Sequence, residues 1–272
     1  MELGTRRVME AAEAALSNAR RRVLELMASG EASRRLSRGF FGDVSLAVDV
    51  EAERAIISTL SDRLGSVAFV TEEGGILGNE DNHDYLVIID PVDGSNNAMV
   101  GIPFFAGALA IAKGSTYHDI IAAVVVNYSS GEIYKAAEDD ALKNGKPIRV
   151  CEDVSLNESF IAFDPRILKK QPDKGLELVN SVKNVRFFGS AILESLLVAE
   201  GKLHAFVAYP RIMRPLDFVP SAYILQKAHG VADCVDIRLD DLNLLSTERY
   251  AILAASGSRL LEELARLLTS TA

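Results

Sequence analysis

The strongest constraint on the fold is a change in the order of predicted elements near residues 140–155. Before it, two helical segments precede a series of short apolar strands. After the turn residues Asn144 to Pro147, short strands alternate with helices to the end of the sequence. Runs of strands favour an α+β arrangement, whereas alternation favours strands joined by helices. We therefore predict an α+β lobe over 1–145 joined to an α/β lobe over 146–272.

Hydrophobic periodicity defines the individual elements. Apolar residues at helical spacing from Val8 to Met27 predict a first helix, and a second is expected over 49–64 with Asp49 as its cap. The polar, basic stretch 31–42 has no clear period, so we predict a mobile loop there. Strands are predicted at 67–71, 85–90, 107–113, 120–127, 132–137, 159–162, 185–188, 205–207 and 250–254, with further helices at 173–182, 190–199, 218–229 and 258–268.

Composition narrows the classes of partner. The 272 residues carry a formal net charge of -9, which disfavours nucleic acid and anionic membranes as main partners. The longest apolar stretches are too short to cross a bilayer. Cys151 and Cys234 do not form a CxxC pair, and the first residues lack the apolar run of a secretion signal. These features predict a cytoplasmic protein with reduced cysteines.

Acidic residues occur at the ends of several predicted elements. They are Asp49, the pair Glu72-Glu73, the segment Asp90 to Ser95 (Asp-Pro-Val-Asp-Gly-Ser), and Asp217. Each alone is compatible with a helix cap, a solvated loop or a turn. Together they are more specific, because neighbouring strands that end in Glu72 and Asp90 would place several carboxylates at one sheet edge. That proximity is costly unless a cation binds among them.

The type of ligand predicts the type of ion. An all-oxygen set favours a hard cation, Mg²⁺ or Mn²⁺, over zinc. The four histidines show no spacing typical of metal ligands. Gly94 to Asn97 follow the second carboxylate, and backbone N–H groups there could bind a phosphate beside the metal. A metal next to a phosphate site is the arrangement for metal-assisted phosphoester hydrolysis.

These motifs, in this order, resemble those of the inositol monophosphatase family, part of the lithium-sensitive phosphatase superfamily that includes fructose-1,6-bisphosphatase. The resemblance runs from about residue 43 to residue 229. It implies a five-layered αβαβα sandwich of the sugar phosphatase type, an α/β (α+β) fold, and a homodimer. The Arg-Pro-Leu-Asp form of the last motif looks most like archaeal members that accept both inositol monophosphate and fructose-1,6-bisphosphate.

The resemblance also implies residue roles. The metal ligands it implies, for two or three Mg²⁺ (or Mn²⁺) ions, are Glu72, Glu73, Asp90, the Val92 carbonyl, Asp93 and Asp217. The residues that orient the attacking water are Asp49, Glu72 and Ser95. The implied substrate contacts are Gly94, Ser95, Asn96, Gly189 and Ser190. The sequence departs from the family pattern at Asn97, at Leu216 and over the run 218–221. These departures put the substrate pocket in question, whereas the metal ligands are unaffected.

Two basic regions have alternative interpretations. Arg211 and Arg214 lie in a segment stiffened by prolines, and we predict that they bind a second phosphate. The alternative is that they offset nearby acids or pair across a subunit interface. Ser37 and Arg38 are predicted to lie on a flap that closes over the site, or else on a solvated basic segment.

The predicted function is hydrolysis of a small phosphorylated polyol or sugar, inositol monophosphate and/or fructose-1,6-bisphosphate, by metal-activated water. One alternative is a nucleotidase for adenosine 3′,5′-bisphosphate, although the sequence shows no evident aromatic platform for a base. Another is a non-catalytic regulatory protein on the same fold, which a lost metal ligand would favour. All the implied ligands are present.

Overall fold

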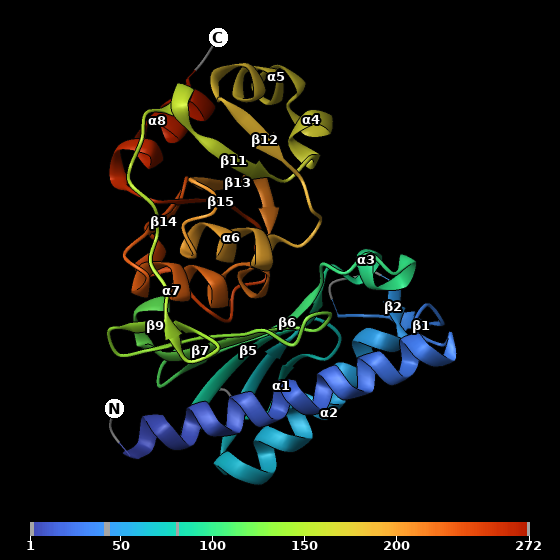
Figure 1. Ribbon diagram of the computed structural model, residues 1–272. Coiled ribbons are helices and arrows are strands. Elements are labelled where there is room, and N and C mark those ends of the chain that lie inside the picture. The colour runs from blue at the N-terminus through green and yellow to red at the C-terminus, as the bar shows by residue number, and fades with distance from the viewer. Residues whose placement is uncertain (1–2, 41–43, 80–81, 271–272) are drawn as a thin grey trace.

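The computed structural model describes residues 3–40, 44–79 and 82–270, which form two large β-sheets, a separate two-stranded sheet and three layers of helices (Figure 1). One outer layer consists of α1 (Leu3–Ser29) and α2 (Ala47–Leu64), packed against each other and against the larger sheet. No helix in the described part of the chain is long and apolar enough to span a membrane.

The larger sheet has eight strands in the order β10-β9-β8-β7-β6-β5-β3-β4. All its neighbouring strands are antiparallel except β3 and β5, which run parallel. Its strands are β3 (Val67–Thr71), β4 (Gly75–Leu77), β5 (Tyr85–Asp93), β6 (Ala106–Ala112), β7 (Ile120–Asn127), β8 (Ile133–Ala137), β9 (Asp140–Lys143) and β10 (Lys146–Pro147).

The central helices α6 (Ala191–Ala199) and α7 (Val219–Lys227) pack between the two sheets and touch both. The second sheet has the order β12-β11-β13-β15-β14, with bounds β11 (Phe160–Phe163), β12 (Asn184–Arg186), β13 (Ala205–Met213), β14 (Val231–Cys234) and β15 (Tyr250–Ala255). On its far side, α8 (Ser258–Thr269) buries leucines spaced four residues apart, Leu260, Leu264 and Leu268. With α4 (Arg166–Lys170) and α5 (Pro172–Ser181), α8 completes the fifth layer. The predicted αβαβα architecture is confirmed.

Three predictions of local structure were wrong. Within 31–42, residues Arg35–Arg38 form β1, which pairs with β2 (Val44–Leu46) in an antiparallel hairpin. The strand predicted over 85–90 continues to Asp93, so the Asp-Pro-Val-Asp segment is not a plain turn. Asp49 does not cap α2, because Leu46 is the capping residue and Asp49 lies within the first turn. A short helix, α3 (Ser95–Val100), follows Gly94.

Candidate metal and phosphate site

The acidic residues meet where β3 and β5 end. These strands are parallel neighbours with Thr71 opposite Ile89, so the next residues along, Glu72 and Asp90, lie side by side. Asp217 reaches the same place on a 3₁₀ turn, Pro215–Asp217, that contacts β5. All three carboxylates line one cavity of about 670 Å³. The predicted convergence at one sheet edge is therefore present.

A bulge brings Asp93 to the same cavity as Asp90. Side chains three residues apart on a regular strand point to opposite faces of the sheet. Between Asp90 and Asp93, however, three steps along β5 pair with only two steps along β6, from Ala108 to Ala106. The extra residue reverses the alternation, and Pro91 is tolerated there because a bulge leaves a backbone group unpaired. Both aspartates consequently line the cavity.

Asp90 is the most deeply buried of these carboxylates, with 3% of its surface exposed. Within the described chain its Oδ1 atom has no hydrogen-bond partner. Burial, followed by the charges of Asp93, Glu72 and Asp217, holds the pKa of Asp90 well above its usual range. A buried carboxylate oxygen that accepts no hydrogen bond is typical of an oxygen that binds a cation.

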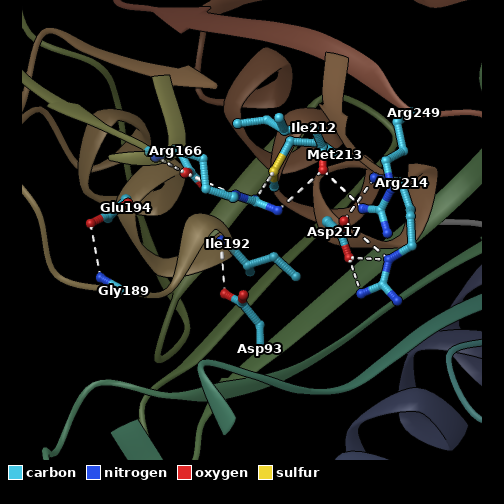
Figure 2. Close-up of polar contacts among 11 residues, drawn as sticks. Asp93, Arg166, Gly189, Ile192, Glu194, Ile212, Met213, Arg214, Asp217 and Arg249 are labelled. Atoms are coloured by element: carbon cyan, nitrogen blue, oxygen red, sulfur yellow. Dashed lines mark hydrogen bonds and ion pairs between the residues drawn. The ribbon is translucent and has the colours of Figure 1, made fainter. Parts of the chain in front are cut away.

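Arg214 lies between two of the predicted metal ligands, Glu72 and Asp217, and Figure 2 shows its contacts with Asp217. Its Nη2 is 2.8 Å from Glu72 Oε1 and 2.7 Å from Asp217 Oδ1, and its backbone N–H donates to Asp217 Oδ2 at 2.7 Å. Among the described residues, no three acidic, histidine or cysteine groups are placed so that they could hold a metal ion together. The arginine supplies positive charge to this pair of carboxylates.

Asp93 connects the first sheet to the central helices. Its Oδ2 accepts hydrogen bonds from the hydroxyl of Ser190 and from the backbone N–H of Ile192, the latter at 2.9 Å (Figure 2). Ser190 is the N-cap of α6. Burial raises the pKa of Asp93 to about 7, although these hydrogen bonds act in the opposite direction. The predicted substrate residue Ser190 thus also holds a predicted metal ligand.

Asp49 and Ser95, two of the residues that the resemblance implies for orienting the attacking water, are joined by a hydrogen bond. Ser95 Oγ lies 2.8 Å from Asp49 Oδ1 and 2.8 Å from the carbonyl oxygen of Val92. Burial, followed by the nearby charge of Glu72, raises the pKa of Asp49 to about 7. A carboxylate with this pKa can exchange a proton near neutral pH.

The loop that carries the predicted phosphate contacts is tightly packed. Gly94 has φ of 87°, and a Cβ there would lie 3.0 Å from the Phe104 carbonyl oxygen and 3.2 Å from that of Gly189. The buried side-chain amide of Asn97 donates to the carbonyls of Phe104 and Phe188, both at 2.8 Å. These bonds join the Gly94 loop to the Gly189 loop, and the cavity is lined by Gly94, Ser95, Asn96, Gly189 and Ser190.

Five predicted site residues are absent from the cavity lining or have side chains that are not described, namely Asp49, Glu73 and Arg211 in the first case and Ser37 and Arg38 in the second. Glu73 is not among the residues that line the cavity, and its backbone N–H donates to Glu53 at 2.9 Å. Arg211 is also absent from the lining, since its guanidinium pairs with Asp236 and donates to the Arg249 carbonyl. The side chains of Ser37 and Arg38 lie outside the described residues, so the flap remains a prediction.

The lining residues that sequence reasoning missed include Glu194, Arg166, Lys170 and Arg249. Glu194 accepts the backbone N–H groups of Phe188 and Gly189, and burial raises its pKa to about 8. A signal for it existed, because it is the single acid in the apolar segment 191–199. The basic residues had no comparable signal, since they come from separate parts of the chain.

Comparison with known proteins agrees with this geometry. The sequence profile described as the inositol monophosphatase family matches residues 5–271. The chain belongs to this family. It is 32% identical over 228 residues to the fructose-1,6-bisphosphatase of Pyrococcus furiosus, covering 84% of each chain. It is 35% identical over 206 residues to the fructose-1,6-bisphosphatase/inositol-1-monophosphatase of Methanocaldococcus jannaschii, covering 75% of this chain and 77% of that protein.

Solved structures share the fold. An inositol monophosphatase–fructose 1,6-bisphosphatase superposes with a TM-score of 0.84 at 25% identity, covering 98% of this chain and 100% of the other. A protein from Pyrococcus horikoshii, with similarities to inositol-1 monophosphatase, has a TM-score of 0.78 at 29% identity, covering 93% and 95%. The predicted family and the predicted class, a phosphoric monoester hydrolase, are confirmed.

Membership of the inositol monophosphatase family implies a divalent-metal-dependent phosphatase. The chemistry of the side chains present fits such an ion, although the described residues are not gathered into a closed metal site. Glu72, Asp90, Asp93 and Asp217 line the cavity with carboxylate oxygens, which suit a hard cation, and the buried Asp90 Oδ1 accepts no hydrogen bond within the described chain.

Proposed function

We propose that this phosphatase is Mg²⁺-dependent and hydrolyses phosphate monoesters of small polyols or sugars, namely inositol monophosphate and fructose-1,6-bisphosphate. The observation that carries the proposal is the unpartnered Oδ1 of Asp90, buried between Glu72, Asp93 and Asp217 beside the Gly94 loop. The names of the relatives, which include both activities, support this choice of substrates.

The residues that would hold the ions are those at the ends of β3 and β5 and on the 3₁₀ turn. Glu72, Asp90, the Val92 carbonyl, Asp93 and Asp217 would hold two of these ions. Glu73 would lie near a third. Bound Mg²⁺ would lower the pKa of water and neutralise negative charge on the leaving oxygen; Mn²⁺ has the same ligand preference.

The protein's own groups would then position the reactants. Asp49, with its raised pKa, is suited to take a proton from the attacking water, and Ser95 holds this carboxylate in place through the 2.8 Å hydrogen bond. The backbone N–H groups of Gly94 and Ser95, with Asn96, would bind the phosphate. Gly189 and Ser190 would face the polyol from the other wall of the cavity. No covalent phosphoenzyme is required.

The predicted role of Arg214 in binding a second phosphate conflicts with its present contacts. Its guanidinium is held by Glu72 and Asp217, so it would have to leave both carboxylates to reach a substrate. We propose that the main role of Arg214 is to neutralise the negative charges of Glu72 and Asp217. This is the alternative in which the arginine offsets nearby acids.

We further propose that the enzyme is a cytoplasmic homodimer that does not use nucleic acid or membranes as partners. The net charge of -9 supports the exclusion of anionic partners. Light scattering after gel filtration would test the dimer directly, since a protomer has a mass of 29.4 kDa.

A panel of phosphate esters tests the proposed reaction. Phosphate release is measured from inositol 1-phosphate, fructose-1,6-bisphosphate and adenosine 3′,5′-bisphosphate, each with Mg²⁺ and with EDTA. We expect release from the first two with Mg²⁺ only. A preference for the nucleotide would indicate the nucleotidase alternative, and no release from any ester would indicate a non-catalytic protein.

A further inference from the structure

Three cationic side chains line the part of the cavity that the C-terminal lobe contributes. Arg166 and Lys170 belong to α4, and Arg249 immediately precedes β15. Figure 2 shows Arg166 and Arg249 on the side of the site away from Asp93. The chain as a whole carries an excess of nine negative charges, so a group of cations at one cavity wall contrasts with the rest of the molecule.

One main-chain oxygen positions two of these cations. Arg166 Nη1 donates to the Ile212 carbonyl at 3.3 Å, and Arg249 Nη1 donates to the same oxygen at 3.0 Å (Figure 2). Ile212 lies near the end of β13, two residues before Arg214. The two guanidinium groups are therefore held close together by the rigid sheet, although a carbonyl group does not neutralise their charge.

The nearby carboxylates do not neutralise all of these positive charges. Asp164 binds Arg166 with both carboxylate oxygens, the shortest contact being 2.6 Å. Among the described residues, neither Arg249 nor Lys170 forms an ion pair with a carboxylate. This wall therefore has a surplus of positive charge and donors that point to no acid. Guanidinium groups bind phosphate oxygens in pairs, and an ammonium group adds a flexible charge.

The cavity can accommodate a substrate that reaches both walls. Its volume of about 670 Å³ lies in the usual range for small-molecule sites, and the Gly94 loop and the cationic side chains both line it. The two arginines predicted for a second phosphate are engaged elsewhere, Arg211 with Asp236 and Arg214 with Glu72 and Asp217. Other cations of the cavity, which the sequence analysis did not identify, are therefore better placed to bind a second phosphate.

We propose that Arg166, Lys170 and Arg249 form a second anion subsite that selects substrates with a phosphate at each end over monophosphates. The inference rests on the proposed phosphatase function, because the first phosphate must lie at the Gly94 loop for the second to reach these side chains. Arg249 is the main contact, since it is half-buried and pairs with no acid in the described chain. Lys170 is exposed and contributes less.

Steady-state kinetics on two substrates tests this subsite. The enzyme with Mg²⁺ is assayed on fructose-1,6-bisphosphate and inositol 1-phosphate, with the variants Arg249→Gln, Lys170→Gln and the double variant. We expect Arg249→Gln to lower kcat/KM for the bisphosphate about tenfold more than for the monophosphate, mainly through KM. Lys170→Gln should give a selective loss of about threefold, as expected for an exposed charge.

Matched controls come from two cationic side chains that do not line the cavity. Lys169→Gln changes the same residue type one position away on α4, and Arg238→Gln removes an exposed arginine that pairs with Asp240. Both should leave the ratio of the two substrates at the wild-type value. Arg249→Lys should recover part of the selectivity, because charge is kept while the paired donors are lost.

The outcomes separate the two proposals. Equal losses on both substrates in Arg249→Gln, or a wild-type enzyme that hydrolyses inositol 1-phosphate but not the bisphosphate, would overturn the subsite and leave the phosphatase proposal intact. No phosphate release from either ester by the wild-type enzyme would overturn the phosphatase proposal itself, and the subsite with it.

Discussion

The two walls of the cavity are built in opposite ways. The carboxylates come from the ends of buried strands, and Asp90 and Asp93 owe their common orientation to a bulge in β5. The cations come from a five-residue helix and a loop, and the Arg166 side chain is 45% exposed. The comparison shows that the fold fixes the groups for chemistry, whereas surface residues that could change without harming the core would set the choice of substrate.

The walls also differ in their effect on stability. Burial raises the pKa of Asp49, Asp90, Asp93 and Glu194, so the ionised carboxylates oppose folding at neutral pH. Arg214 counters this with a charge of opposite sign. The cations of the opposite wall are more exposed, and their removal should have little effect on stability. The following predictions test this contrast, beginning with the largest expected effect.

Arg214→Gln should destabilise the metal-free protein by about 3–5 kcal/mol, because it leaves Glu72 and Asp217 buried beside each other without their cation. Chemical denaturation in EDTA measures this loss, and Mg²⁺ should restore more stability to the variant than to the wild type. Arg214→Lys, which keeps the charge, is the control. Identical unfolding curves in EDTA for wild type and Arg214→Gln would contradict the idea that the guanidinium stabilises the carboxylates.

Asp90→Asn should lower kcat at saturating Mg²⁺ by at least about a hundredfold, ~2.7 kcal/mol of barrier, because it removes the most deeply buried of the proposed carboxylate ligands. The metal-free variant should be as stable as the wild type or more so, since one buried charge is gone. Asp84→Asn is the control, because Asp84 is exposed at the opposite end of the same strand. An Asp90→Asn enzyme with more than a tenth of wild-type kcat would argue against Asp90 as a metal ligand.

Glu194→Gln should reduce the pH dependence of stability. The folded-state pKa of Glu194 is raised to about 8, so its contribution favours the folded state at low pH and is lost as pH rises through that value. In EDTA, we expect the wild type to lose about 2 kcal/mol more unfolding free energy than Glu194→Gln between pH 5 and pH 8. Parallel curves for the two proteins would show that Glu194 ionises as easily in the folded state as in the unfolded one.

Phe40→Ala should have the smallest effect. The backbone N–H of Phe40 donates to the Glu73 carbonyl at 3.1 Å, and its ring covers Gly75, so this residue docks the β1–β2 hairpin beside Glu72. Loss of the ring should raise the Mg²⁺ concentration for half-maximal activity about threefold, if the hairpin acts as a flap. Leu77→Ala, another partly exposed apolar residue on the same sheet edge, is the comparison. Unchanged Mg²⁺ dependence in Phe40→Ala would leave the hairpin without a role in metal binding.

Much of the fold could be predicted because its signals are local. The strands 67–71 and 120–127 were predicted with the observed bounds, since each is a short apolar run between polar residues. The β1–β2 hairpin could not be predicted in the same way. Its strands have four and three residues, too few for alternation to stand out, and their pairing depends on contacts with the rest of the chain.

The site divides in the same manner. Asp90 and Asp93 were found because they follow an apolar strand within a short motif, although the bulge that aligns them depends on pairing with β6. Arg166 and Arg249 are separated by more than eighty residues and meet only through the Ile212 carbonyl. No spacing pattern in the sequence predicts that these two residues lie close together. The contacts of Arg211 with Asp236 and Arg249 were hidden for the same reason.

The arginine between Glu72 and Asp217 changes how metal content should follow the surroundings. A chain that carries its own cation can fold before it meets any ion, so newly made protein does not depend on the metal supply. Metal binding then exchanges the guanidinium of Arg214 for a metal ion at the carboxylates. Its free energy is the difference between the attraction of the carboxylates for the ion and their attraction for the guanidinium. We expect occupancy to rise over the range of free Mg²⁺ where that difference changes sign, which makes the enzyme responsive to the ion rather than permanently charged with it.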